Sequence, residues 1–297
     1  MTQETMQQRM KSDIALIEQT ILALLPEKTD CAQRKLLDAV CYSLEAGGKR
    51  IRPMLALEFC RICGGNDDMI LPAACALELY HTSTLIHDDL PEMDNDSLRR
   101  GKPSCHVAFG TATALLAGDT MMMMPFEWIA GSKAIDDSRK IALVRELAVA
   151  GGLYGACGGQ QVDLQNESRT DVSLSELTEM YSYKTGALII AACRMGCIAA
   201  GADAKIIAIA EEYAKKIGLA FQIVDDILDV TADEAALGKP VGSDIEQNKN
   251  TFVSLYGLEQ AKAEAQSLTT EALALLGQLP DTEFLQELTN FLLTRQF

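Results

Sequence analysis

The sequence predicts an all-α fold that forms a single domain. Apolar residues recur at helical spacing through almost every segment of the 297-residue chain. Alternating β-branched runs and turns of the Asn-Gly type are missing. The breaks between helical segments are short, and no linker or low-complexity tract divides the chain. We therefore expect one domain over residues 1–297, built from roughly ten or more helices.

The helices are predicted in chain order from their apolar stripes and stop signals. The first stripe ends before Pro26, and the second is closed by Gly47-Gly48. Longer helical stretches, rich in Ala, Leu, Ile and Glu, follow at 66–89, 111–130, 138–157, 174–201 and 204–230. Residues 188–200 are apolar nearly all round, so we expect this segment to lie inside the bundle.

Composition excludes some classes of function. The chain carries 26 Lys and Arg against 42 Asp and Glu, a net charge of −16. A nucleic-acid-binding protein should instead present a dominant basic face. No signal-peptide core is evident, and no apolar run approaches the ~20 residues of a membrane-spanning helix, so we expect a cytoplasmic protein with no transmembrane segment.

The nine cysteines fit a reducing compartment, because they are odd in number and scattered. Only Cys60 and Cys63 form a C-x-x-C pair, which lacks the second pair that a zinc site needs. We expect reduced thiols packed as small apolar side chains.

Two acidic segments, at 85–94 and 221–229, each place adjacent aspartates directly after an apolar helical run. In the second, Asp225 and Asp229 are four residues apart, so they lie on one helix face and can share a cation. Asp226 points away from that face by about a third of a turn.

The first segment places Asp94 six residues after Asp88, a spacing that no continuous helix aligns. Pro91 disfavours helix at Leu90, so the helix should end there and the chain can fold Asp94 back toward Asp88. A calcium loop is disfavoured, because the glycine and the terminal glutamate of such loops are absent.

Carboxylates on rigid helices bind hard cations, which take phosphate oxygens as further ligands. A single pair of aspartates usually lies at a solvent-exposed helix end. Two such pairs that follow apolar helical segments need bound cations to offset the cost of burying their charge. Basic side chains lie close to both clusters: Lys49, Arg52, Arg99, Arg100, Lys102 and Lys239. Any one of these residues is more simply explained as a surface charge. Together they indicate groups that bind phosphate.

In its ordered motifs the chain resembles the short-chain trans-prenyl diphosphate synthases, of the bacterial farnesyl or plant-type geranylgeranyl kind. These motifs are GGKRIRP, LIHDDLPEMDNDSLRRGKP, LAGD, GGQQVDL, KTGAL, GLAFQIVDDILD, GKPVGSD and NKNTF. The resemblance implies a helical bundle around a central cavity, with the two aspartate clusters facing each other across its mouth. It also implies a magnesium-dependent transferase that forms a homodimer and binds three Mg²⁺.

The same resemblance implies roles for individual residues. The implied metal ligands are Asp88, Asp94 and Asp225, supported by Asp89, Asp229 and Asp244. The allylic diphosphate is expected at Arg99, Lys184 and Lys239, and Lys249 is a weaker candidate for binding a diphosphate. Isopentenyl diphosphate is expected at Lys49, Arg52, His81 and Arg100. The polar groups expected near the developing cation are Thr185 and Gln222.

His81 also has a structural alternative, since a lone helical histidine usually packs. It precedes Asp88 by seven residues, nearly two turns, which places both close to one helix face and favours a role in the site. The neighbouring His87 is expected to pack.

The implied reaction ionises an allylic diphosphate, such as dimethylallyl, geranyl or farnesyl diphosphate. Isopentenyl diphosphate attacks the allylic cation, and the departing diphosphate takes the proton. A terpene cyclase is a rival, but it would lack the isopentenyl group and normally the second DDxxD. A non-catalytic subunit of a heteromeric synthase is the other rival, but such subunits typically lose an aspartate motif.

Product length is predicted from the helix that carries the first cluster. Farnesyl-type relatives commonly have an aromatic residue five positions before the first aspartate, where this chain has Ser83. Thr84 lies one turn before Asp88 and Tyr80 two turns before it, about 12 Å along the helix, so Tyr80 offers a deeper floor. Packing of Tyr80 between helices is the alternative. We expect a twenty-carbon product, with farnesyl diphosphate as runner-up.

Overall fold

The computed structural model describes residues 1–27, 30–167, 169–231 and 250–293. The first half of this part contains α1 (Gln3–Leu24), α2 (Arg34–Leu44), α3 (Ile51–Ile62), α4 (Asp67–Asp88), β1 (Leu98–Arg99), β2 (Lys102–Pro103), α5 (Cys105–Phe109) and α6 (Thr111–Gly131). The second half contains α7 (Asp137–Gly151), α8 (Ala156–Asn166), α9 (Leu174–Tyr181), the π-helix η1 (Ser182–Gly186), α10 (Ala187–Ala200), α11 (Ala204–Thr231), α14 (Phe252–Tyr256), α15 (Leu258–Leu276) and α16 (Glu283–Leu293).

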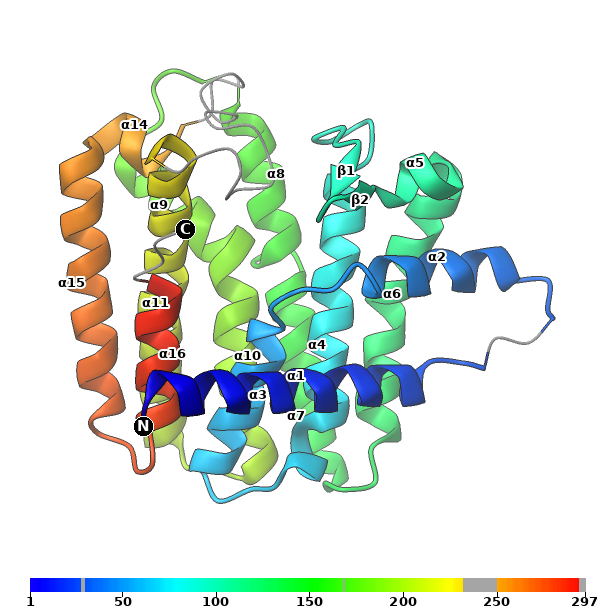
Figure 1. Cartoon of the computed structure of the whole chain (residues 1–297), viewed down its shortest axis with the longest axis horizontal. Helices are drawn as coiled ribbons and strands as arrows, with labels where there is room; N and C mark the ends of the chain where they lie inside the picture. The colour runs from blue at the N-terminus through cyan, green and yellow to red at the C-terminus, as the bar shows by residue number, and fades with distance from the viewer. Residues whose placement is uncertain (28–29, 168, 232–249, 294–297) are drawn as a thin grey trace.

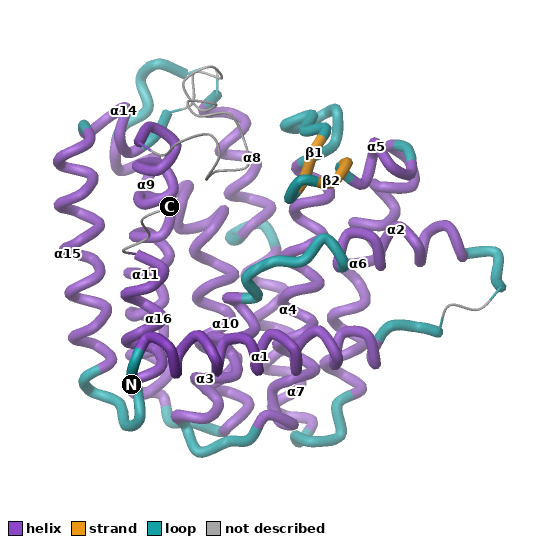
Figure 2. Tube along the Cα trace, in the orientation of Figure 1, coloured by secondary structure: helices purple, strands orange, loops and turns teal. Residues whose placement is uncertain are grey.

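The described residues form an all-α bundle, which confirms the predicted fold class. Strand is confined there to the short β1–β2 hairpin (Figure 2). The long helices α4, α6, α10, α11 and α15 run side by side, while α1 crosses the bundle (Figure 1). The ends of α4 and α11 that carry the two aspartate clusters lie at the same end of the bundle (Figure 1).

The core explains why α10 is apolar all round. This helix packs against α3, α4, α7 and α11, and most of its side chains are buried. It approaches α3 closely because Gly196 has no side chain: a Cβ there would lie 2.3 Å from the Ala56 carbonyl oxygen. The expectation that residues 188–200 lie inside the bundle is confirmed.

A glycine also fixes the position of α4 against α6. A Cβ on Gly118 would lie 2.1 Å from His87 Nε2, so only glycine lets the ring approach the helix. The ring nitrogen lies 3.2 Å from the Leu115 carbonyl oxygen. His87 therefore packs between helices, as expected.

The helix predicted over 138–157 is wrong at its end. The chain leaves α7 at Gly151 and starts α8 only at Ala156, because Gly152 adopts extended backbone angles and Gly155, at φ −145° and ψ −142°, is not helical. The β1–β2 hairpin was also missed. Arg100 and Gly101 both have positive φ, 54° and 75°, which is the pattern of a type I′ turn without its usual Asn-Gly sequence.

Three described stretches are long and apolar enough to cross a membrane by length and composition: Asp67–Asp88, Asp137–Asn166 and Leu174–Ala200. The expected absence of such stretches is therefore not confirmed. The bundle buries 72% of the first apolar window and 56% of the third, which accounts for their composition. Only 33% of the second window is buried.

Candidate active site

The first aspartate cluster lies at the C-terminal end of α4, where the chain turns back. The Asp94 amide donates to the Asp88 carbonyl oxygen at 2.9 Å, and the Asn95 amide donates to Leu90 at 3.1 Å. Asn95 adopts φ 52°, a left-handed conformation that Asn tolerates. The predicted return of Asp94 to Asp88 is confirmed.

Asp88 is an electrostatically unfavourable carboxylate in the absence of a cation. The pKa of Asp88 is raised to about 6, first by burial and also by the nearby Asp94, against the opposing effects of Lys184 and Arg99. Bound positive charge would relieve this cost. Hard carboxylate oxygens in such a setting suit Mg²⁺.

Asp89 takes a different partner from its neighbour. Its carboxylate is buried and accepts hydrogen bonds from Arg99, including one from Nε at 2.9 Å. Arg99 also contacts Asp96 at 3.4 Å. Asp89 therefore orients Arg99 beside the first cluster, and its supporting role toward metal stays a prediction.

The second cluster lies on α11. Asp225 is half-buried, and Asp229, one turn further, is 2% exposed. Asp226 turns to the interior, where its Oδ2 accepts hydrogen bonds from the Tyr181 hydroxyl and the Phe252 amide, both at 2.7 Å. The prediction that Asp226 points away from the helix face of Asp225 and Asp229 is confirmed.

A polar network connects this interior aspartate to the residues expected near the reacting carbon. The Thr185 hydroxyl donates to Gln222 Oε1 at 3.1 Å, and Gln222 Nε2 donates to Asp226 Oδ1 at 3.3 Å. The network fixes which way the Gln222 amide points.

Lys184 lies in the π-helix η1, a local distortion that often marks functional sites. Its ammonium group donates to Asp163 Oδ2 on α8 at 2.5 Å. Burial lowers the pKa of Lys184, but Asp163, Asp88 and Asp94 outweigh it and raise the pKa overall. Gly159 permits this contact, because a Cβ there would lie 2.2 Å from the Lys184 amide nitrogen.

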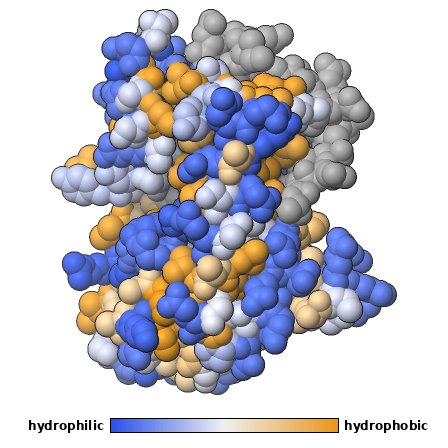
Figure 3. All heavy atoms as spheres, turned by 90° about the vertical axis from the view of Figure 1, so that its left-hand side faces the viewer, coloured by the Kyte–Doolittle hydropathy of each residue, from blue (hydrophilic) through white to orange (hydrophobic). Residues whose placement is uncertain are grey.

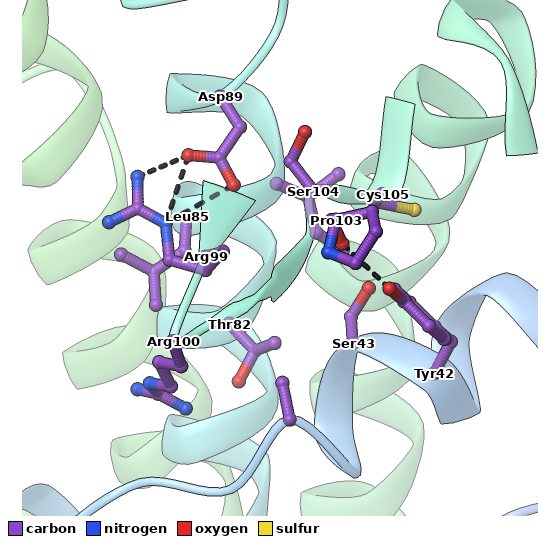
Figure 4. Close-up of a pocket in the computed structure, with 12 residues that line it drawn as sticks. Tyr42, Ser43, Thr82, Leu85, Asp89, Arg99, Arg100, Pro103, Ser104 and Cys105 are labelled. Carbon is purple, nitrogen blue, oxygen red and sulfur yellow. Dashed lines mark hydrogen bonds and ion pairs between the residues drawn. The ribbon is translucent and has the colours of Figure 1, made fainter. Parts of the chain in front are cut away.

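Arg99 and Arg100 point apart, although they are adjacent. Both line a small pocket of about 30 Å³ between α2, α4 and the hairpin (Figure 4). Arg99 reaches up to Asp89, and Arg100 extends away from it (Figure 4). The Arg100 guanidinium lies against Gly48, where a Cβ would be 2.8 Å from its Nη1.

A second group of basic residues lies on the side toward which Arg100 extends. Lys49 is exposed, and Arg52 is half-buried in the first turn of α3. Arg52 Nε is buried and makes no hydrogen bond within the described residues. Burial lowers the pKa of Arg52 and of Arg100. Arg100 lowers the pKa of Arg52 further, and Arg50 and Arg99 lower that of Arg100.

His81 is neutral in this setting. Its pKa is lowered well below the ordinary value, first by burial and then by Arg52 and Arg100. A neutral imidazole donates one hydrogen bond and accepts another, so His81 can contact a phosphate without adding charge.

The residues predicted to set product length lie on another side of α4. The Tyr80 hydroxyl donates to the Gly151 carbonyl oxygen at 3.0 Å. Ser83 is fully buried and donates to Tyr80, while half-buried Thr84 donates to the His81 carbonyl oxygen. Both hypotheses for Tyr80, floor and packing, fit these contacts.

The structure leaves part of the predicted site undescribed. Lys239, Asp244 and Lys249 lie outside the described residues. Among residues 1–27, 30–167, 169–231 and 250–293, no three His, Cys, Asp or Glu side chains form a preformed metal-binding group.

Sequence reasoning missed Asp163 and Glu78. Asp163 lies in the GGQQVDL segment, four residues after Gly159, a spacing that puts both on one helix face toward Lys184. Glu78 lies in α4 and binds Arg50. The sequence feature that could have identified Glu78 is a glutamate within an otherwise apolar helical segment.

Two carboxylate clusters at one end of an all-α bundle, with separate cationic groups beside them, fit a protein that binds metal and diphosphate together. The profile of the polyprenyl synthetase family matches residues 33–286, and the chain belongs to this family. The resemblance seen in the sequence motifs is confirmed.

Relatives with two different product names are similar to the chain. A geranylgeranyl diphosphate synthase of Cyanophora paradoxa is 45% identical over 238 residues, covering 80% of this chain and 79% of the relative. A farnesyl diphosphate synthase of Haemophilus influenzae is 43% identical over 263 residues, covering 88% and 89%. The crystal structure of a geranylgeranyl pyrophosphate synthetase from Pyrococcus horikoshii aligns with a TM-score of 0.91 at 32% identity, over 99% of both chains.

Proposed function

We propose that the protein is a prenyltransferase that joins an allylic diphosphate to isopentenyl diphosphate and makes a short-chain prenyl diphosphate. The observation that carries this proposal is the separation of two cationic groups beside the first aspartate cluster. Arg99 and Lys184 lie near Asp88, whereas Arg100 extends away from Asp89 (Figure 4) and lies close enough to Arg52 to lower its pKa. Two groups of this kind suit two diphosphates held side by side.

Magnesium is the proposed cofactor, and three ions are proposed from the family resemblance. The carboxylates proposed to hold them are Asp88, Asp94, Asp225 and Asp229, with Asp89 and Asp244 in support. The buried carboxylate of Asp88, which needs positive charge, supports this assignment. When bound, the metal supplies stabilisation of the leaving diphosphate.

The protein's own residues then hold and orient the reactants. Arg99 and Lys184 bind the allylic diphosphate, and their charge favours breakage of the allylic C–O bond. Lys49, Arg52, His81 and Arg100 hold isopentenyl diphosphate so that its double bond faces the allylic carbon. The dipoles of the Thr185 hydroxyl and the Gln222 amide are oriented toward the positive charge that develops on the allylic group. The departing diphosphate accepts the proton, and apolar walls exclude water.

The proposed product has twenty carbons, with fifteen as the alternative. The absence of an aromatic side chain at Ser83 supports the longer product. Relatives that carry either product name are about equally similar to the chain, at 45% and 43% identity.

A homodimer is proposed as the working form. Large apolar side chains are exposed along α6, α7 and the loop after α7, including Met123, Ile141 and Leu153 at 68%, 70% and 76% exposure. The face around α15, on the other side of the bundle, carries mainly hydrophilic side chains with scattered apolar areas (Figure 3). A second copy would cover the α6–α7 face, and light scattering after size exclusion tests this. Nine cysteines without a disulfide support the proposed cytoplasmic location.

One assay tests the reaction. The protein is incubated with Mg²⁺, isopentenyl diphosphate and dimethylallyl, geranyl or farnesyl diphosphate, and products are identified by mass. We expect prenyl diphosphates lengthened by five carbons per step. Cyclic hydrocarbons formed without isopentenyl diphosphate would support the cyclase alternative. No product with any primer would leave the non-catalytic subunit as the remaining hypothesis.

A further inference from the structure

A buried ion pair lies beneath the group proposed to bind isopentenyl diphosphate. Arg50 Nη1 donates to Glu78 Oε1 at 2.9 Å, and these residues are 4% and 2% exposed. Arg50 Nη2 donates to the Leu44 carbonyl oxygen at 2.8 Å and lies 3.5 Å from Glu18. One guanidinium thus connects α4 with the end of α2 and with α1.

Arg50 also determines the path of the basic turn. It directly follows Gly47, Gly48 and Lys49 and is the N-cap of α3. Its φ of 49° is left-handed, a strained conformation for a residue with a side chain. The ion pair with Glu78 holds Arg50 in this conformation. The turn in turn places Gly48 against the Arg100 guanidinium.

Glu78 is also the carboxylate that faces the surrounding cations. Burial lowers the pKa of Arg52 and of Arg100, and Glu78 is the largest opposing influence on both. His81 follows Glu78 by about one turn on α4. Three guanidinium groups outnumber the buried carboxylate of Glu78 and the half-exposed one of Glu18, which leaves the region positive and suited to a diphosphate, while Glu78 limits the repulsion among the cations.

We infer that Glu78 is a positioning residue for the second diphosphate substrate: through Arg50 it fixes the Gly47–Lys49 turn and, with it, Arg52 and Arg100. This inference rests on the proposed function. Glu78 acts through Arg50 and does not contact substrate. Its effect should therefore fall on isopentenyl diphosphate and spare the allylic primer, which is held by Arg99 and Lys184.

Glu78→Gln tests this inference, because it keeps the shape of the side chain and removes its charge. We expect the KM for isopentenyl diphosphate to rise about tenfold or more, while the KM for geranyl diphosphate changes less than about twofold. Glu78→Asp should recover part of the loss. Glu18→Gln is the matched control: it removes the half-exposed partner of the same arginine and should leave both KM values within about twofold.

The direction of the change distinguishes positioning from a simple effect of charge. If Glu78 only weakened the positive field, Glu78→Gln would lower the KM for isopentenyl diphosphate, and that result would overturn the inference. Equal increases in both KM values would overturn it as well, because they indicate a general structural role. Should Glu78→Gln not fold, Arg50→Lys loosens the same turn and must show the same selective increase.

The wild-type protein separates this inference from the function on which it rests. A wild-type protein that turns over isopentenyl diphosphate, with Glu78→Gln unchanged, overturns the inference alone. A wild-type protein without turnover, and without calorimetric binding of isopentenyl diphosphate in Mg²⁺, overturns both.

Discussion

The amide nitrogen of Asp94 lies 2.9 Å from the carbonyl oxygen of Asp88, so the chain returns to the end of α4 after Pro91. This turn brings a second carboxylate toward one that is already partly buried. The arrangement is unfavourable without a cation, and three predictions about charge follow from it and from the adjacent arginines.

Removing the carboxylate of Asp88 or Asp225 should abolish turnover and preserve the fold. In Asp88→Ala and Asp225→Ala the proposed metal ligands are lost, so no product should form even at saturating Mg²⁺. Asp68→Asn, which removes an exposed charge at the other end of α4, should stay within about twofold of the wild-type rate. Near-wild-type rates in either alanine variant would contradict the assignment.

Asp88→Asn should not lower the melting temperature at pH 7 without metal. The pKa of Asp88 is raised to about 6, mainly by burial, so the stability that the protonated carboxyl contributes below about pH 4 is lost as pH rises to about 6. The neutral amide avoids this cost. Mg²⁺ with inorganic diphosphate should raise the melting temperature of the wild type and leave that of Asp88→Asn unchanged. An equal increase in both would argue against Asp88 as a ligand.

Arg99 and Arg100 should serve different substrates. Arg99 is held by Asp89 beside the first cluster, and Arg100 lies against Gly48. Arg100→Ala should mainly raise the KM for isopentenyl diphosphate, and Arg99→Ala the KM for the allylic primer. A lost charge-assisted contact costs about 1.5–3 kcal/mol, or roughly 10- to 150-fold. If both variants affected one substrate only, this division would fail.

His81 should contribute a hydrogen bond and no charge. Burial and the neighbouring arginines lower its pKa, so it is neutral at pH 7. His81→Gln keeps an N–H donor and should change the KM for isopentenyl diphosphate by less than about threefold. His81→Ala should raise it by an order of magnitude, within the range expected for a hydrogen bond to a charged group. A large defect in His81→Gln at pH 7 would indicate a charged imidazole instead.

Local sequence signals predicted the helices well, because apolar spacing and stop signals act within a few residues. Pro91 even predicted the return of Asp94. The π-helix at 182–186 was not predicted: its sequence, SYKTG, contains no proline, and one helical stretch was expected over 174–201. The hairpin turn was missed because Arg100 takes a position where Asn is usual.

Most of the site contacts that the sequence did not predict join residues that are distant in sequence. Lys184 binds Asp163, 21 residues away, and Arg50 binds Glu78, 28 residues away. Neither pairing has a local signature, because each depends on how whole helices pack. The sequence motifs predicted Lys184, but only the structure shows that the carboxylate of Asp163 orients it.

The predicted product length depends on Tyr80, whose side chain is held at both ends. Its backbone belongs to α4, and its hydroxyl donates to Gly151 at the end of α7. A Cβ on Gly151 would lie 2.2 Å from the ring, so α7 lies directly against it. A ring held in this way cannot swing aside easily, and it would stop a chain that grows down along α4 from Asp88.

The wild type should therefore release a twenty-carbon product, and Tyr80→Ala should extend it beyond twenty. Ser83→Tyr places a ring closer to Asp88 and should shorten the product to fifteen carbons. Cys157→Ala is the control, because it removes the weak contact at 3.9 Å from the tyrosine hydroxyl and leaves the ring in place. Truncating a buried aromatic ring costs about 3–5 kcal/mol, so products are compared by mass at a temperature where each variant is folded. A wild type that stops at fifteen carbons, and a Tyr80→Ala variant that does the same, would show that Tyr80 only packs between the helices.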